Sequence, residues 1–399
     1  MAQGRLFIGV GILIAVAGTA TAQPAFPASS GSSLGPNGSA FPTSLSTPAT
    51  MGLPPVPPPN DSSIQTLSAL TDDHPPVKEL HSGLPELVPP PDKHHGDHEI
   101  PGSMTPFYPG HSGWYTSGEF LLMRPRTTNL DYAVLGTSNG LGTVGPVESL
   151  GYNVGTGLRA EVGYRFGEGK WEAGFSYTYL EATGSSAIAA LPGEVLYPTT
   201  TRPGLTDRAL TAGGNTDLDY MLFDMIVARR MLIDDNFALR WIGGGRFADI
   251  RQVANTYFNG NDARGAAVLT RSRFQGFGPI IGVEAIFGCW HGFHLYSRAT
   301  VGLVSGRNTN RLVETNDSGA TTYVNTSYDL WKIVPTGSLA IGFGWQYKNL
   351  SLRAGYEIQQ WQGIFERAGY TDDVSQGSFN ARSTNLSIQG LFLQSVLNF

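Results

Sequence analysis

The sequence predicts an all-β fold: a transmembrane, antiparallel, up-and-down β-barrel of about 10 strands (8–12), preceded by a disordered proline-rich segment. Three observations support this prediction. Segments between residues 113 and 399 alternate apolar and polar residues, which is the period of a strand. The N-terminus has the pattern of an export signal. The polar positions of the alternating segments hold arginine, acids and glycine more often than lysine.

Residues 1–22 are predicted to be a cleaved signal peptide. Arg5 is the charge that precedes the apolar run 6–17, and Ala20-Thr21-Ala22 offers small residues for cleavage. The run is too short to span a bilayer as a helix. An uncleaved membrane anchor is the alternative. No later segment has about eighteen consecutive apolar residues, so no transmembrane helix is expected after it.

Residues 23–112 are predicted to form a disordered periplasmic linker rich in proline, serine and histidine. Such a composition cannot bury enough apolar surface to offset chain entropy, and its proline runs favour an extended spacer. The stretch KHHGDHE contains weak metal-ligand candidates, His94, His95 and His98, beside Asp97. A solvated low-complexity tract is the simpler interpretation, because no fold fixes the ligand geometry.

Residues 113–399 are predicted to form the barrel, and the alternation defines its strands in order. The stretch 158–166 alternates Leu, Ala, Val, Tyr and Phe with Arg, Glu, Gly and Arg, and the stretch 170–179 repeats the pattern after a Gly-Glu-Gly turn. Membrane strands need about 9–11 residues, and the candidates fit: 114–124, 152–166, 170–181, 217–229, 237–250, 274–287, 293–304, 330–346, 350–361 and 384–399.

The predicted connections also alternate in length. Short turns are expected at 167–169, 231–236, 288–292 and 347–349, and long loops at 125–151, 182–216, 251–273, 305–329 and 362–383. Outer-membrane barrels have short periplasmic turns and long external loops. This parity places both ends of the barrel on the periplasmic side.

The apolar face is predicted to meet lipid and the polar face to line the lumen. Paired guanidinium and carboxylate groups suit a confined polar interior, and in lipid only a closed sheet pairs every strand backbone group. A soluble β-sandwich with its apolar face inward is the alternative. The predicted lumen-lining residues are Arg159, Glu161, Arg165, Glu172, Asp224, Arg240, Arg246, Glu284, Arg298, Arg353 and Glu357. The predicted lipid-interface aromatics are Trp171, Tyr179, Phe237, Trp241, Phe343, Trp345 and Phe399.

The C-terminal strand ends in GLFLQSVLNF, and a terminal aromatic residue is typical of strands read by the bacterial barrel-assembly machinery. Leu391, Leu393 and Leu397 share one face, whereas Leu386 and Ile388 fall on the other phase. We therefore expect a β-bulge near Gly390.

The segment FDMIVARRMLIDDNFALRWIGGGRFADIRQ resembles a strand pair of the Legionella-type major outer-membrane proteins, a pore-forming barrel family. The similar pattern is an aspartate, a basic pair and Gly-Gly-x-Arg-Phe-Ala, represented here by Asp224, Arg229, Arg230 and residues 244–248. FQGFGPIIGVEA, LSLRAGYEIQQW and RAEVGYRFGEGKWEAGFSYTYL are similar to further strands. The resemblance covers residues 114–399 and implies a pore in the bacterial outer membrane, with no catalytic residues.

Two functions follow as hypotheses. The first is a pore for ions or small polar solutes. The second is a structural anchor with a side-chain-filled lumen and a periplasmic tether, because barrels of about eight strands are filled whereas 16–18 strands leave a channel. An outer-membrane enzyme is not expected, since His291 and His294 lie beside a predicted periplasmic turn and the long loops contain no histidine.

The expected partners are outer-membrane lipids, the barrel-assembly machinery and a cell-wall or periplasmic partner for the linker, with oligomerisation left open. No cofactor is expected. The net charge of −6 argues against nucleic-acid binding. The lone Cys289 excludes an intrachain disulfide.

Overall fold

The computed structural model describes residues 112–137, 145–167, 170–234, 236–372, 374 and 377–399. The predicted signal peptide and all of the predicted linker but residue 112, including His94, His95 and His98, lie outside the described residues. In the part that is described, no helix has the length and apolar character needed to cross a membrane.

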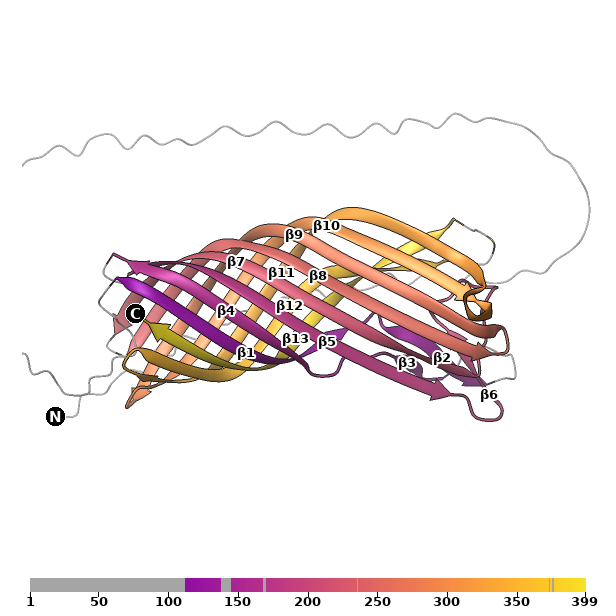
Figure 1. Ribbon diagram of the computed structural model, residues 1–399, viewed down its shortest axis with the longest axis horizontal. Coiled ribbons are helices and arrows are strands. Elements are labelled where there is room, and N and C mark those ends of the chain that lie inside the picture. The colour runs from indigo at the N-terminus through magenta and orange to yellow at the C-terminus, as the bar shows by residue number, and fades with distance from the viewer. Residues whose placement is uncertain (1–111, 138–144, 168–169, 235, 373, 375–376) are drawn as a thin grey trace, which may run out of the picture. The chain divides into compact units, whose positions relative to one another are not determined.

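Ten antiparallel strands close into a barrel (Figure 1), which confirms the predicted fold class. Around the ring the order is β1-β13-β12-β11-β10-β9-β8-β7-β5-β4, so that neighbours along the chain are neighbours in the wall. The strands are β1 (Gly113–Thr127), β4 (Gly155–Phe166), β5 (Trp171–Ala189), β7 (Thr211–Asp234), β8 (Phe237–Gly260), β9 (Ala263–Trp290), β10 (Phe293–Asn316), β11 (Thr321–Tyr347), β12 (Leu350–Tyr370) and β13 (Phe379–Asn398).

Both ends of the barrel sequence lie at the same end of the cylinder. The amide of Phe399 donates to the carbonyl of Trp114 at 2.9 Å, and β1 closes the ring against β13. The short turns, such as the one between β11 and β12, lie at this end too. We call it the periplasmic end and the opposite end the external end, following the loop rule of outer-membrane barrels.

Four of the predicted long loops are much shorter than expected, because the strands continue past the membrane. The loop predicted at 251–273 shrinks to a hairpin between β8 and β9, and the loop predicted at 305–329 shrinks to the 3-10 turn η1 (Asp317–Gly319) between β10 and β11. A strand of 24 residues, such as β8, extends about 80 Å, whereas the apolar band of an outer-membrane barrel is about 25 Å tall. Even after tilting, about half of the barrel therefore stands outside the lipid.

The polarity of the wall reverses where the strands leave the membrane. On β8 the outward side chains change from Trp241 and Phe247 to Asp249 and Arg251, while the inward ones change from Arg240 and Arg246 to uncharged residues. The inward set of the external half is buried and largely apolar, and its apolar members include Leu121, Met123, Leu180, Leu218, Tyr220, Ile250, Phe274, Trp361, Leu386 and Ile388. This reversal explains why the sequence predicted loops where the external half has strands, because its outward side chains are polar like those of a loop.

The same reversal explains β13 and corrects the predicted bulge. Gly390 pairs with Met123 on one side and Glu357 on the other, and the register runs unbroken through both ladders at this point. Leu386 and Ile388 are fully buried inside the barrel, whereas Leu391 and Leu393 face outward. The apolar stripe changes face because the surroundings change from lipid to the external half, and no extra residue is needed.

A second, smaller sheet forms in the connections at the external end (Figure 1). It has the order β3-β2-β6, from β2 (Asp131–Thr137), β3 (Val147–Ser149) and β6 (Glu194–Pro198). Tyr132, Ala133 and Leu196 are fully buried in the same apolar cluster as the inward residues of the wall. This small sheet therefore fills the external half of the barrel.

Candidate functional site: the charged lumen and its external plug

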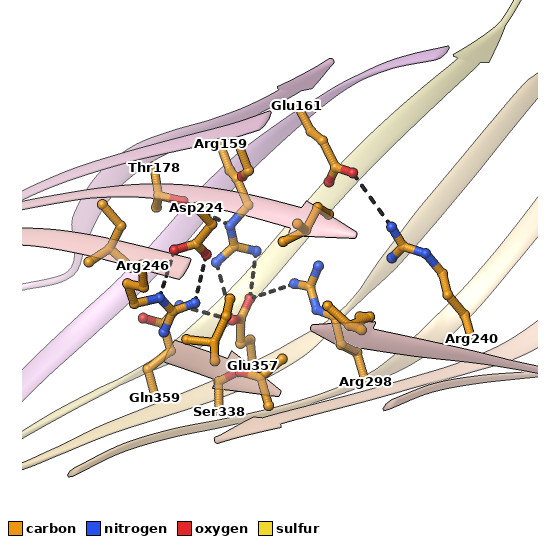
Figure 2. Close-up of a pocket in the computed structure, with 16 residues that line it drawn as sticks. Arg159, Glu161, Thr178, Asp224, Arg240, Arg246, Arg298, Ser338, Glu357 and Gln359 are labelled. Carbon is orange, nitrogen blue, oxygen red and sulfur yellow. Dashed lines mark hydrogen bonds and ion pairs between the residues drawn. The ribbon is translucent and has the colours of Figure 1, made fainter. Parts of the chain in front are cut away.

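The predicted lumen-lining residues all lie on the inward phase of their strands, in the half of the barrel that carries the apolar outer band. Most are buried, and Figure 2 shows several of them pointing toward one another. They form two connected groups of ion pairs and one separate pair, Arg246 with Asp224. Together with two residues that the sequence analysis missed, Glu119 and Arg230, they make a layer of seven arginines and six carboxylates.

The group nearer the periplasmic end centres on Glu172 and Arg240, which form an ion pair. Glu172 also accepts from Arg165 at 3.4 Å and pairs with Arg230 at 3.8 Å. Arg240 continues to Glu284 at 3.0 Å. Glu284 also pairs with Arg353 at 3.2 Å, and Arg240 also pairs with Glu161 at 3.7 Å. Each buried charge therefore has at least one opposite charge beside it.

The second group lies closer to the external half and crosses the lumen. Arg159 on β4 donates to Glu119 at 2.7 Å. It also donates to Glu357 on β12 at 3.0 Å and 3.2 Å (Figure 2). Arg298 approaches Glu357 at 3.6 Å. The adjacent Arg246 binds Asp224 through two hydrogen bonds of 2.8 Å and 2.7 Å. These planar, bidentate contacts are the geometry that arginine provides and lysine does not.

Opposite walls of the barrel meet directly above this group. The hydroxyl of Tyr220 on β7 donates to Gln359 on β12 and accepts from the indole of Trp361 at 3.1 Å. β7 and β12 are five strands apart in either direction around the ring. Tyr220 and Trp361 are both fully buried. This contact spans the full diameter of the lumen.

The small sheet is tied to the wall by polar contacts. Arg367 on β12 donates to the carboxylate of Asp131 at 2.7 Å and to the carbonyl of Thr199 at 2.8 Å. Asn129 donates to Gln252 on β8 at 3.0 Å. Burial lowers the pKa of Arg367 despite the neighbouring Asp131. Arg367 thus contacts both connections that fill the external half, the one between β1 and β4 and the one between β5 and β7. We call these two connections, with their small sheet, the plug.

A buried carboxylate lies further out along β10. Glu314 is fully buried, and it accepts a hydrogen bond from the amide of Arg202 at 2.8 Å. Arg202 belongs to the connection after β6, the second part of the plug. Burial raises the pKa of Glu314 to about 7, and the hydrogen bond from Arg202 only partly offsets this effect. Glu314 thus joins β10 to this connection through the amide of Arg202.

The interior leaves little free volume. A cavity of about 50 Å³ lies between the two charged groups, among Arg159, Asp224 and Arg298, and one of about 40 Å³ lies toward the periplasmic end beside Arg165. A water molecule needs roughly 10–15 Å³ of such space. These cavities can therefore hold a few waters but no larger solute.

The predicted interface aromatics lie on the outward phase of their strands. Trp171, Trp241, Phe343 and Phe399 are exposed to the surroundings of the barrel, as is Tyr179, while Phe237 and Trp345 are half-buried. The predicted basic pair separates: Arg229 stacks outward over Trp171, with its guanidinium 5.3 Å from the ring centre, whereas Arg230 faces Glu172 inside.

The sequence signal for Glu119 was obscured by its neighbours. It lies in GEFLLMR, where the inward Leu121 and Met123 are also apolar, so that alternation is lost over the second half of β1. The cross-lumen pair of Tyr220 and Trp361 has no signal in the sequence, because the two residues are 141 positions apart. The described residues contain no group of three or more metal-binding side chains.

A comparison with protein families now identifies the chain. Residues 108–399 match the family described as Legionella pneumophila major outer membrane protein precursor. The chain belongs to this family. Its members are outer-membrane β-barrel proteins of bacteria, which agrees with the closed ten-stranded barrel and confirms the predicted family and location. No curated protein matches the sequence.

Solved structures with similar folds are distant from this member of the Legionella family. The outer membrane protease OmpT from Escherichia coli matches with a TM-score of 0.42 and 11% identity over 72% of this chain and 97% of that chain. The toluene transporter TodX from P. putida matches with a TM-score of 0.31 and 10% identity over 72% and 90%. No conclusion about this chain is drawn from either match.

Proposed function

We propose that this protein is a structural outer-membrane barrel with a filled lumen, which anchors the chain in the outer membrane. The observation that supports this proposal is the contact between opposite walls, where Tyr220 meets Gln359 and Trp361. Below it the lumen is filled by ion pairs, and above it by the small sheet. A ten-stranded barrel is narrow enough for side chains to fill it.

The anchored part is then the segment that precedes β1. Gly113 begins the first strand at the periplasmic end, next to the C-terminal Phe399. The first strand therefore begins at the end where a periplasmic tether would join it. A periplasmic or cell-wall partner for this segment, and recognition of the C-terminal strand by the barrel-assembly machinery, remain part of the proposal.

A pore for ions or small polar solutes is the second candidate. It is favoured by the charged layer, because rings of charged side chains set the selectivity of channels, and by the cavities beside it. Passage would require Tyr220 and Trp361 to separate and the small sheet to leave the external half. The two candidates therefore differ in how often the lumen opens.

Planar-bilayer recording of the purified full chain distinguishes them. At low voltage we expect only the baseline current of the lipid bilayer itself, with rare channel openings, because hydrogen-bonded side chains block the lumen. Heat-modifiable migration on a gel serves as the control that the barrel is folded and inserted. A steady current with defined ion selectivity from folded protein would reject the filled barrel and favour the pore.

A further inference from the structure

The outer surface of β8, β9 and β10 carries a compact set of arginines just beyond the apolar band. Arg251 lies directly opposite Arg273 in the ladder between β8 and β9, and Arg271 lies directly opposite Arg311 between β9 and β10. Arg271 and Arg273 are two residues apart, so they share a face of β9. We call these four residues the arginine block.

The arginine block is only partly neutralised. Arg273 donates to Asp249 at 2.9 Å and 2.6 Å, and Arg251 approaches Asp219 at 3.8 Å. Arg271 and Arg311 form no ion pair with a described carboxylate. Like charges directly opposite on neighbouring strands destabilise a sheet. An anion held between the two guanidinium groups would turn this repulsion into attraction.

The height of the block above the lipid indicates the kind of anion. Arg251 follows the outward Phe247 by four residues, Arg273 precedes Phe277 by four and Arg271 precedes it by six, and both phenylalanines belong to the apolar band. Four to six residues of a tilted strand rise roughly 10–15 Å. The headgroup layer of an ordinary bilayer extends about 5–8 Å beyond the hydrocarbon. A phospholipid phosphate therefore lies below the block, whereas phosphates on a tall sugar headgroup reach it.

We propose that Arg251, Arg271, Arg273 and Arg311 bind phosphate groups of a glycolipid in the outer leaflet of the outer membrane. The acyl chains of that lipid lie along the apolar band below, and its sugar phosphates lie between the facing guanidinium groups. Arginine binds phosphate through two parallel hydrogen bonds, so that Arg271 and Arg311 can share one phosphate. The site lies on the outside of the barrel and does not depend on whether the lumen opens.

Native mass spectrometry of the full chain in detergent tests the proposal with four probes: a phosphorylated rough lipopolysaccharide, the same lipid after phosphatase treatment, phosphatidylglycerol, and inorganic phosphate. We expect retention of the phosphorylated glycolipid above the other three. In the R271Q/R311Q variant its affinity should fall about thirtyfold, since each arginine near an anionic membrane surface contributes about 1 kcal/mol.

R208Q/R264Q is the matched control, because it removes the same charge from exposed arginines at the external end, one in the connection after β6 and one at the start of β9. This control should bind the glycolipid like the wild type. Heat-modifiable migration provides a second readout. Without glycolipid, R271Q/R311Q should be at least as stable as the wild type, because repulsion is relieved, and with glycolipid it should gain less stability.

Equal retention by R271Q/R311Q and the wild type would overturn the proposal. Equal retention of the dephosphorylated lipid would overturn it too, because apolar contact alone would then explain binding. If inorganic phosphate or phosphatidylglycerol bound as tightly as the glycolipid, with the same loss in R271Q/R311Q, the site would bind any phosphate and the glycolipid assignment would be wrong.

Discussion

Arg159 and Glu357 illustrate how single residues make a charged lumen stable. Taking a charge out of water is costly unless opposite charges and hydrogen bonds replace the solvent. Arg159 meets two carboxylates, and Glu357 meets Arg159, Arg298 and the amide of Gln359 at 2.8 Å. Each charged group in this arrangement is therefore used in at least one ion pair. The charged layer therefore resembles a packed interior more than the wall of a water-filled channel.

Glu314 behaves differently, because it is buried without an arginine side chain in ion-pair contact. Its pKa in the folded protein, about 7, lies above the ordinary value of 4.5. The folded state therefore holds this proton more tightly than the open state. The resulting stability is complete below about pH 4.5 and is lost as the pH rises through about 7.

We predict that the connection after β6 opens more readily at pH 8 than at pH 5, and that E314Q removes this dependence. The free energy of opening should fall by at most about 3 kcal/mol over that range in the wild type. Limited trypsin digestion after Arg208, with rates normalised to E314Q, measures it. E181Q, at an exposed carboxylate on β5, should keep the wild-type pH dependence. Equal pH slopes in wild type and E314Q would contradict the prediction.

At the scale of elements, the small sheet covers the external side of the lumen. β2 and β6 pair with each other, with Val134 opposite Tyr197, although residues 138–193, 56 in all, separate the two strands and include three other strands. Their buried side chains pack on the inward face of the wall. The contacts of Arg367 with Asp131 and Thr199 hold this part of the molecule to β12.

We predict that R367Q raises the open probability in planar bilayers while the barrel remains folded. The substitution removes charge-assisted hydrogen bonds to Asp131 and Thr199, which contribute about 2–3 kcal/mol to docking of the small sheet. R264Q, at the tip of the β8–β9 hairpin, should leave the current unchanged. An unchanged current in R367Q would mean that the charged layer alone closes the lumen.

At the scale of the whole molecule, the reversal of wall polarity defines where the membrane ends. Ile281 lies within the apolar band, outward and 64% exposed, between Gly243 and Val301 of the neighbouring strands. Tyr257 is also outward and 50% exposed, yet it lies far along β8 in the external half. The two positions are similarly open, but lipid surrounds the first and water the second.

We predict that I281R destabilises the folded barrel by about 2–4 kcal/mol, whereas Y257R changes its stability by less than about 0.5 kcal/mol. A charge in the middle of the apolar band must leave water, and a charge on the external half does not. Urea titrations of refolding into phosphatidylcholine vesicles measure both. Comparable costs at the two positions would place the membrane boundary elsewhere on the barrel.

The sequence by itself determined the barrel strands that cross the lipid, their number and the parity that places both ends together. Lipid outside and charge inside impose an alternation at every second residue, and the turns at the periplasmic end interrupt it sharply. Residues such as Arg159, Glu172 and Glu357 were identifiable because a strand fixes the direction of each side chain.

Only the tertiary structure decided which of those charges are paired and whether the lumen is filled. Glu357 meets Arg159, and Tyr220 meets Trp361, because a closed ring brings residues from distant strands together, and no local pattern encodes such contacts. The strands of the external half were also apparent only from the tertiary structure. Beyond the lipid its outer face is wet and its inner face is covered by the small sheet, so the alternation changes phase where the solvent changes.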